Sequence, residues 1–471
     1  MGPSCNAVGS LRDQATQRAE ANTPAGKEDE SWLQKVARRI QEGQEPVEAV
    51  QALRESSAAS LLSLRMPTTR DEQWRFTDIR KLLLTADVWP APPHFPSVDI
   101  SQCTLPEADQ TRIVLVDGVI APSLSHLNGL LDGITVEPLA TSAARETAGQ
   151  HLGSLAGQGQ GGLDVFSALN GAAASDVLLV NIPDGKQLDK PLHIVYHSTG
   201  SGDGTTRLAS PRLLVVAGKH AEVEIVEEFT GGGGAYWTNA LAEFVLGEHS
   251  KVSHTYIQQQ AKEGIHTKRT YVALATKAEY RATETGWGGR LTRHNLHIQQ
   301  LGPETVTDVA TFYLAGRSQL HDLHSSLYLD YPRGQSNQLH KCIVTHATGH
   351  GVFDGNVRVN KLAQQTDANQ LSRNLLLAPR ATVNIKPNLQ IIADDVKCTH
   401  GAAISDLEED QLFYFQARGI DAATARSALV YSFGCEVTDR LNFEGLRNRV
   451  QDGIRQALIS EGALASNLGP A

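Results

Sequence analysis

The chain has 471 residues, and this length predicts about two or three domains rather than a single hydrophobic core. Apolar residues make up 41% and charged residues 20% of the sequence, which is typical of a globular protein. The formal net charge of -10 argues against a nucleic-acid-binding protein, because neutralising phosphates requires clustered Lys and Arg. No apolar run approaches the roughly 20 residues needed to cross a bilayer, so we expect no membrane association.

Cysteine usage points to a reducing compartment, because the cysteines are scattered and thiols of this kind stay free there. They are Cys5, Cys103, Cys342, Cys398 and Cys435. No local four-cysteine motif occurs, so any iron or zinc would be held with few thiolates of this chain. No secretory hydrophobic region follows Met1, and we expect no export signal.

The N-terminal part is expected to be a leader followed by a helical domain. Residues 1–30 lack apolar periodicity and are predicted to be a disordered leader, whose acidic residues make it a poor transit peptide. A helix is predicted to begin at Ser31, a good N-cap, and to bury apolar residues at helical spacing. These residues are Trp32, Leu33, Val36 and Ile40. The segment 66–84 is predicted to be partly helical, and a Pro-rich stretch at 89–96 closes the N-terminal helical domain, assigned to 31–110.

Short β-type runs recur over residues 111–404, and each is interrupted by a tight turn. They include 212–226, 243–257, 270–283, 311–324 and 374–385. A β-helix, in which each coil buries its inward face on its neighbours, and a β-sandwich both contain many short strands. The connecting segments lack the regular hairpin signals of a sandwich. We therefore predict a mainly β fold with a β-helix core over 111–404.

Residues 405–471 are predicted to form a C-terminal helical domain. A helix is expected to begin at Ser405 or Asp406, with acidic residues in its first turn. Gly419 occupies the position of a C′ glycine, and Asp421 is the predicted N-cap of the next helix. A third helix is predicted over 443–460. From the pattern alone, capping the β-helix is favoured over docking a partner.

The stretch "VKCTHG" places Cys398 and His400 one residue apart near the end of a strand. With a period of two, both side chains share one face of that strand. Leu389, Ile391 and Ile392 are predicted to be buried. Zinc and iron sites need three or four ligands, so other ligands would have to come from elsewhere. The alternative is a packed cysteine and a hydrogen-bonded histidine.

A second group of potential ligands lies in the middle of the chain. It consists of His321, His324, His340, Cys342, His346 and His350. The segment "HATGHG" contains a glycine and is typical of a turn rather than of a helix with two ligands on one face. We therefore interpret this group as packing residues.

Motifs of autonomous enzymes are absent from the sequence. No phosphate-binding G-x-x-x-x-G-K-[ST] loop occurs, and the glycines of 231–237 precede no helix start. No G-x-S-x-G elbow is present. Asp394 and Asp395 are neighbours in an extended segment, so their side chains face opposite ways. We expect no nucleotide on this chain and no catalytic activity of its own.

Three blocks of the sequence resemble the SufB/SufD family of iron–sulfur cluster assembly scaffolds. They are "MPTTRDEQWRFTDIRKLL", "DVFSALNGAAASDVLLVNIPDGKQLDKPLHIVYH" and the long run from "GVFDGNVRVNKLAQQTDANQ" to "QLFYFQARGID". The resemblance covers nearly all of 31–460. The stretches "DDVKCTHGA" and "SRNLLLAPRATVNIKP" resemble the SufD branch, whereas "VFDGN" and "DEQWRFT" resemble its plastid and cyanobacterial members. That implies the chloroplast stroma or, alternatively, the cytoplasm of a cyanobacterium.

The resemblance implies a right-handed parallel β-helix between two helical domains. It implies a scaffold that pairs with SufB through the β-helices and binds the ABC-type ATPase SufC on the helices of 405–471, which reverses the preference for capping. ATP chemistry would then belong to SufC. A transient Fe–S cluster would form at the SufB–SufD interface, with His400 as a metal ligand from this chain and Cys398 as a second one.

Two other functions compete with this interpretation. A β-helix enzyme acting on polysaccharide predicts an export signal and abundant aromatic residues, yet aromatic residues make up only 6% here. A purely structural partner would stabilise SufB and recruit SufC without ever ligating iron. The sequence leaves that alternative open.

Overall fold

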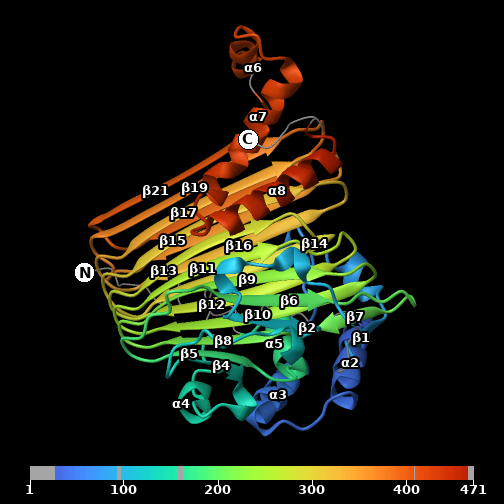
Figure 1. Ribbon diagram of the computed structural model, residues 1–471, viewed down its shortest axis with the longest axis vertical. Coiled ribbons are helices and arrows are strands. Elements are labelled where there is room, and N and C mark those ends of the chain that lie inside the picture. The colour runs from blue at the N-terminus through green and yellow to red at the C-terminus, as the bar shows by residue number, and fades with distance from the viewer. Residues whose placement is uncertain (1–26, 93–96, 157–162, 408, 465–471) are drawn as a thin grey trace, which may run out of the picture.

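The computed structural model describes residues 27–92, 97–156, 163–407 and 409–464. Most of them form a stack of parallel strands, with helices near both ends of the chain (Figure 1). The predicted mainly β fold with a parallel β-helix core is therefore confirmed. The β-sandwich alternative is wrong, because the paired strands of the stack run parallel rather than antiparallel.

The strands form two sheets, and the chain alternates between them as it coils. One sheet has 11 strands and includes the order β20-β18-β16-β14-β12-β10-β8-β5-β4, and the other has 10 strands in the order β21-β19-β17-β15-β13-β11-β9-β6-β2-β3. From β8 onward, each strand thus pairs with the strand one full turn away, about 30 residues along the chain, whereas β2 with β3 and β4 with β5 form antiparallel pairs. Such a coil buries a continuous interior between the two sheets.

The strand bounds are β1 Val88–Pro90, β2 Arg112–Val116, β3 Val119–Ile120, β4 Thr135–Pro138, β5 Leu178–Ile182, β6 Leu192–Ser198, β7 Thr206–Ala209, β8 Arg212–Ala217, β9 Glu222–Gly231, β10 Tyr236–Leu246, β11 Lys251–Gln258, β12 Ile265–Leu274, β13 Glu279–Gly286, β14 Leu291–Gln300, β15 Val306–Ala315, β16 Leu320–Leu329, β17 Gln335–Val344, β18 His350–Val359, β19 Thr366–Leu376, β20 Thr382–Ile391 and β21 Val396–Ser405. The helices are α2 Lys27–Glu42, α3 Glu48–Leu61, α4 Arg145–Gly149, α5 Val165–Ala173, α6 Glu409–Gln416, α7 Ala422–Thr438 and α8 Glu444–Ser460. Short 3-10 or π turns are η1 Glu72–Trp74, η2 Arg80–Leu84, η3 Ser101–Cys103, η4 Pro106–Ala108, η5 Pro122–Leu124 and η6 Leu139–Thr141.

Burial along the strands explains why their sequences form this coil. All ten residues of β12 are buried, because the coil interior covers one face and the N-terminal helices cover the other. Strand β19 instead alternates buried and exposed residues along most of its length. The corner between the sheets repeats a left-handed backbone conformation on successive turns, at His220, His249, Lys277, Glu304, Arg333 and Gln365. The tight turns predicted within 212–226, 243–257 and 270–283 lie at this corner, whereas those within 311–324 and 374–385 lie at the opposite corner, where Ser318 and Arg380 have a positive φ.

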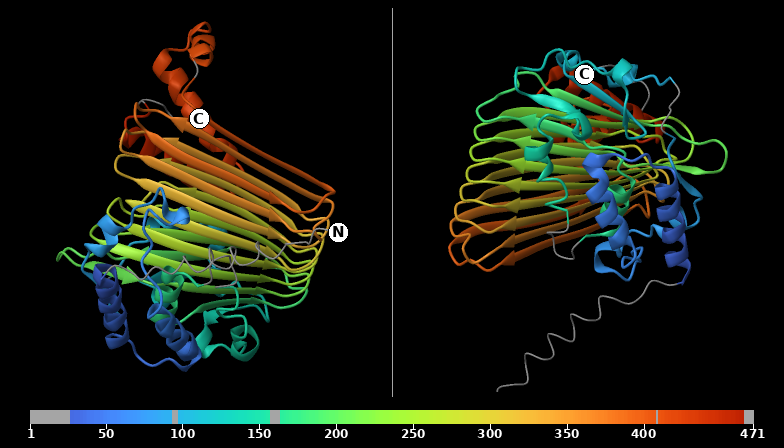
Figure 2. Two further views of the ribbon diagram at one scale, coloured as in Figure 1. Left: turned by 180° about the vertical axis from the view of Figure 1, so that it is seen from behind. Right: turned by 90° about the horizontal axis from the view of Figure 1, so that it is seen from below.

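The N-terminal helices pack on the outer face of the 11-stranded sheet (Figure 2). The four predicted apolar residues of α2, Trp32 to Ile40, are all buried. The predicted helix start at Ser31 is wrong, because α2 begins four residues earlier at Lys27. The remainder of the predicted leader lies outside the described residues. In 66–84 only η1 and η2 are helical, and α4 and α5 lie within the range predicted as β-helix core.

The C-terminal helices α7 and α8 pack on the outer face of the 10-stranded sheet (Figure 1). Gly434 lies so close to β15 that an added Cβ would stand 3.1 Å from Cζ of Phe312. On α8, the guanidinium of Arg449 donates to both carboxylate oxygens of Glu228, at 2.5 and 2.8 Å. Lys341 donates to Glu436 of α7 at 2.5 Å. These ion pairs fix α7 and α8 to the coil.

The start of the C-terminal helical region differs from the prediction. Strand β21 continues to Ser405, which pairs with Leu375 of β19, so no helix begins at Ser405 or Asp406. The next helix, α6, starts at Glu409. The predicted C′ position of Gly419 is confirmed by its φ of 82°, and Asp421 caps α7 by accepting from the amides of Ala423 and Thr424. The third predicted helix is α8.

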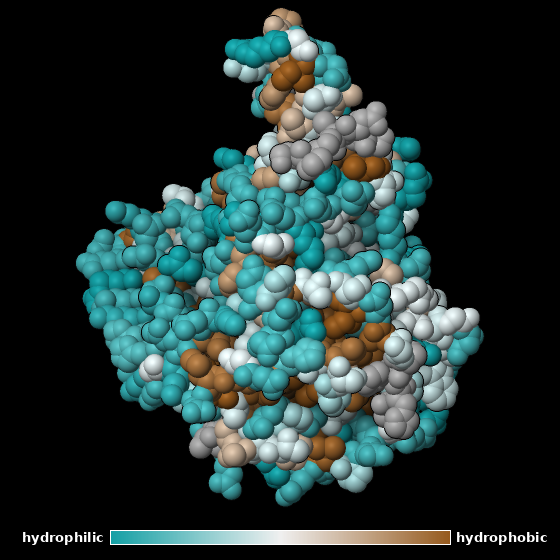
Figure 3. Space-filling view, in the orientation of Figure 1, coloured by the Kyte–Doolittle hydropathy of each residue, from teal (hydrophilic) through white to brown (hydrophobic). Residues whose placement is uncertain are grey.

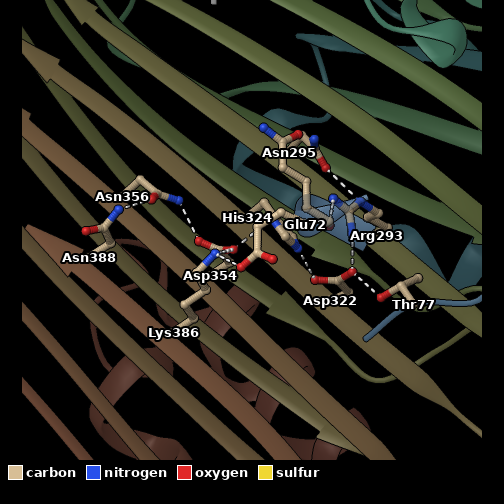
Figure 4. Close-up of polar contacts among 11 residues, drawn as sticks. Glu72, Thr77, Arg293, Asn295, Asp322, His324, Asp354, Asn356, Lys386 and Asn388 are labelled. Carbon is tan, nitrogen blue, oxygen red and sulfur yellow. Dashed lines mark hydrogen bonds and ion pairs between the residues drawn. The ribbon is translucent and has the colours of Figure 1, made fainter. Parts of the chain in front are cut away.

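A polar network joins the N-terminal segment to the outer face of the 11-stranded sheet (Figure 4). Arg293 donates to Asp322 at 2.5 Å, and both are fully buried; Thr77 donates to the same carboxylate. Two turns further along the stack, Lys386 pairs with Glu72 at 2.6 Å. The N-terminal segment is thereby attached to β14, β16 and β20. In the part of the chain that the structure describes, no helix is long and apolar enough to cross a membrane.

Candidate metal half-site at the end of the coil

Cys398 and His400 lie on β21, the last strand of the 10-stranded sheet. In the parallel pairing with β19, Cys398 is opposite Ala368 and His400 is opposite Gln370. Ala368 and Gln370 are buried and face the interior of the coil, whereas Asn369 between them is exposed. The side chains of Cys398 and His400 therefore share the inward-facing side of β21.

The two side chains differ in exposure. Cys398 is half-buried and packs against the main hydrophobic cluster of the coil, and this burial raises the pKa of its thiol. His400 is exposed. It lies on the inward side of a turn that no further turn covers, because the described strands end with β20 and β21. A position that is buried in earlier turns is thus open at this end of the stack.

The prediction that the preceding apolar residues are buried is wrong for two of the three. Ile391 is 46% and Ile392 is 49% exposed, and only Leu389 is partly buried against the core. Ile404, at the end of β21, is 50% exposed. These residues have the composition of a core strand but lack a next turn to pack against. The end of the coil that carries His400 therefore also presents exposed apolar side chains.

Among the residues that the structure describes, no three His, Cys, Asp or Glu side chains come together as a metal site. The pair on β21 is therefore at most half of a coordination sphere. Zinc and iron sites need three or four ligands, so a complete site at this position would need ligands from a second chain. Chemically, the pair offers one imidazole nitrogen and one thiol on adjacent inward positions.

Comparison with known proteins identifies the family of this chain. The chain matches two family models, the SufBD protein N-terminal region over residues 31–194 and the SufBD core domain of SUF system FeS cluster assembly over residues 198–433. The chain belongs to the SufB/SufD family. Members of this family assemble iron–sulfur clusters in the SUF system, and they are assembly scaffolds by type.

Relatives of this SufB/SufD protein come from plastids and bacteria. It is 44% identical to Protein ABCI7, chloroplastic, of Arabidopsis thaliana over 414 residues, which cover 87% of this chain and 86% of the relative. It is 37% identical to an iron–sulfur cluster assembly SufBD family protein of Synechocystis over 84% of this chain and 89% of the relative. Iron–sulfur cluster assembly protein SufD of Escherichia coli is 28% identical over 84% of this chain and 90% of the relative. The first two agree with the plastid and cyanobacterial resemblance of the sequence.

The histidine-rich middle of this SufB/SufD protein does not join the pair on β21. His340 is buried inside the coil, where Oγ1 of Thr311 lies 2.7 Å from its Nδ1, and burial lowers its pKa to about 3. Burial raises the pKa of Cys342 to about 12. His324 lies on the outer face of the sheet beside Asp322 at 2.9 Å (Figure 4). The interpretation of this group as packing residues is confirmed for these three.

The sequence did not single out the inward-facing glutamines beneath His400. Gln370 and Gln338 are buried inside the coil, one and two turns before β21 respectively, and they line up with His400 in the parallel register. The signal that could have identified them is a polar residue that recurs about every 30 residues at an inward-facing position. It becomes visible only once the length of one turn is known.

Proposed function

We propose that this chain is a non-catalytic scaffold subunit of the SUF complex, which pairs with SufB and the SufC ATPase to build and release nascent Fe–S clusters. The observation that carries this proposal is the uncovered end of the coil. There, β20 and β21 each have a free edge among the described strands, next to an exposed ligand-type side chain. A free edge and exposed apolar side chains together favour pairing with another chain.

SufB is the partner that we assign to this end. A second β-helix placed against β20 and β21 would continue both sheets and cover Ile391, Ile392 and Ile404. Each of these is about half exposed in the isolated chain. Burying them is favourable at about 25 cal/mol per Å² of apolar surface. This contact would also enclose His400 between the two chains.

His400 would supply one imidazole nitrogen to iron, and thiolates of SufB would supply the remaining ligands. Iron–sulfur centres with histidine ligands exist, so this ligation is chemically sound. An imidazole among thiolates holds a cluster less firmly, which suits a scaffold that must release its cluster. Cys398 would be a second ligand, although its thiol packs on the core and must first lose a proton.

SufC would bind at α6 and the beginning of α7. These elements project beyond the last turn of the coil, and apolar surface gathers on α6 (Figures 1 and 3). Phe413 is 70% and Tyr414 is 55% exposed, and no described side chain of α6 is buried. ATP binding would bring two SufC copies together. Their motion would reach the sheet through α7, whose Glu436 is bound to Lys341 of β17, and would shift the SufB contact.

The compartment that we propose is the chloroplast stroma, or the cytoplasm if the source is a cyanobacterium. A chloroplastic and a cyanobacterial relative support this assignment. The free cysteines of the described chain suit either reducing compartment.

A second candidate function is a structural partner that recruits SufC and stabilises SufB without ligating iron. The packing of Cys398 against the core favours it, because a packed thiol is a poor ligand. This alternative shares the interface at β20 and β21 with the main proposal. The two differ only in whether His400 contacts iron.

Thiol labelling tests the proposed SufB interface. In the isolated chain we expect slow alkylation of half-buried Cys398 and almost none of Cys342, which is buried and whose pKa is raised to about 12. Binding of SufB is expected to slow the labelling of Cys398 at least about tenfold. Half-buried Cys435 of α7 is the internal control and should keep its rate. Peptide-resolved mass spectrometry measures all of them, and unchanged labelling of Cys398 in a SufB complex would place the interface elsewhere.

Replacing Phe413 with serine tests the SufC site. An aromatic anchor at an interface centre contributes about 2 kcal/mol or more, so we expect the Kd for SufC to rise about 10- to 100-fold. The control is Leu62→Ser, because Leu62 is 83% exposed after α3, near the opposite end of the stack. Isothermal titration calorimetry with SufC gives both values. Equal affinities of the two variants would contradict docking on α6.

A further inference from the structure

Two buried amide side chains lie in line with His400 inside the coil. Gln338 of β17 pairs in register with Gln370 of β19, and Gln370 pairs with His400 of β21. The glutamines are only 4% and 3% exposed, whereas His400 is open to solvent. The three residues therefore form one inward-facing column, with His400 at its open end.

The amides form a directed hydrogen-bond ladder. Nε2 of Gln370 donates to Oε1 of Gln338 at 3.0 Å, and Oγ of Ser325 donates to the same oxygen at 3.1 Å. Gln370 thus donates to the turn before it and leaves its own oxygen for a donor on the turn after it. The oxygen left over at the end of this ladder is Oε1 of Gln370. It is buried and has no hydrogen-bond partner within the part of the chain that the structure describes.

A glycine holds the Gln370 amide in place. A Cβ on Gly355 of β18 would stand 2.3 Å from Nε2 of Gln370 and 2.9 Å from its Cδ, so the amide packs directly against this glycine and a larger residue would displace it. The amide is thus confined between Gly355 and Gln338. A buried acceptor without a donor is unfavourable, and the residue one strand further along the column is His400, whose ring carries an N–H.

We propose that Gln370 is a positioning residue for His400: its Oε1 accepts a hydrogen bond from one ring nitrogen and leaves the other nitrogen as the metal-binding one. The hydrogen bond on one nitrogen of a histidine decides which nitrogen is free to bind a metal. This inference rests on the proposed function for the role of the free nitrogen. The tautomer preference itself does not depend on iron.

The neighbouring column provides a matched control. Asn374 lies on the same strand as Gln370, is 1% exposed, and its Oδ1 likewise has no partner among the described residues. It pairs in register with Ile404, which has no side-chain donor. Asn374→Leu therefore removes a buried amide of the same kind outside the column of His400, together with its hydrogen bonds to Ser372 and to the carbonyl of Ala403 on β21.

The test measures the tautomer of His400 in the full-length chain without metal. Chains labelled with 15N-histidine give the tautomer ratio from two-bond proton–nitrogen NMR correlations, at a pH where the imidazole is neutral, and His400→Gln identifies the His400 signals. We expect Gln370→Met to change the ratio about three- to tenfold, the range that one hydrogen bond supports. Asn374→Leu, which lies outside the column, should leave the ratio unchanged.

Two results would overturn the inference. One is an equal ratio in Gln370→Met and the wild type. The other, which needs no variant, is a wild-type ratio equal to that of the same chain unfolded in urea. Cluster assembly is measured separately, in the complex with SufB and SufC. A tautomer preference without any effect of His400 on assembly would refute the proposed role of His400 as a metal ligand and leave the positioning by Gln370 standing.

Discussion

Replacing Arg449 with leucine is expected to lower the free energy of unfolding by about 3–5 kcal/mol, the usual effect of removing one partner of a buried ion pair. Glu228 is fully buried and receives both hydrogen bonds of the Arg449 guanidinium. Without them its carboxylate still has His193 at 2.9 Å and Gln259 at 2.5 Å, neither of which is a permanent cation. Helix α8 would then lose its main polar attachment to β9.

The matched control is Arg440→Leu. Arg440 pairs with Asp308 at 3.0 Å, but both side chains are about one-third exposed. Exposed pairs of this kind contribute about 0–1 kcal/mol. Urea unfolding followed by circular dichroism measures both variants. A loss below about 1 kcal/mol for Arg449→Leu would show that α8 is held by its apolar face alone.

The same pair predicts a pH dependence. Burial raises the pKa of Glu228, but the hydrogen bonds from Arg449 and His193 outweigh it and lower the pKa to about 2. Because the folded pKa lies below the unfolded value of about 4.3, the pair stabilises the protein above that value. This stability is lost as the pH falls toward 2. The difference between the wild type and Arg449→Leu should therefore shrink in acid.

The sequence predicted the coil but not its end. Apolar runs separated by tight turns identify stacked strands, because each turn buries the same face. Whether Ile391 and Ile392 are buried depends on whether another turn of the coil follows them. The local pattern of apolar residues is the same in both cases, so it cannot predict their burial. The exposure of His400 in the isolated chain depends on the same feature. Its position on β21 is readable from the sequence, but its access to solvent is a property of the whole stack.

Element boundaries show a similar limit. Ser405 and Asp406 are good helix caps, yet β21 continues to Ser405 because pairing with Leu375 satisfies its backbone groups. Ser31 is a good cap as well, yet α2 begins at Lys27 because the preceding lysine and glutamates are good helix formers. By contrast, Asp421 acts as predicted, because it lies between α6 and α7, outside the described strands.

Replacing His400 with alanine is expected to have the largest functional effect. The variant removes the exposed imidazole at the end of the coil without changing the apolar residues that would contact SufB. Loss of one metal ligand typically weakens a site by about 10- to 100-fold or more. We therefore expect an intact complex that assembles at least about tenfold less cluster. Cys398→Ser should have a smaller effect, because this thiol also packs on the core.

The most direct test is the iron and acid-labile sulfide content of the SufB–SufC complex of this chain after anaerobic reconstitution with ATP. We predict a visible cluster absorption in the wild type and in the control His220→Ala, whose exposed histidine lies at a distant corner of the coil. We predict its near loss in His400→Ala, with the subunits still co-purifying. Equal iron and sulfide in the wild type and His400→Ala, with the complex intact, would contradict the metal half-site and leave the chain a structural partner of SufB.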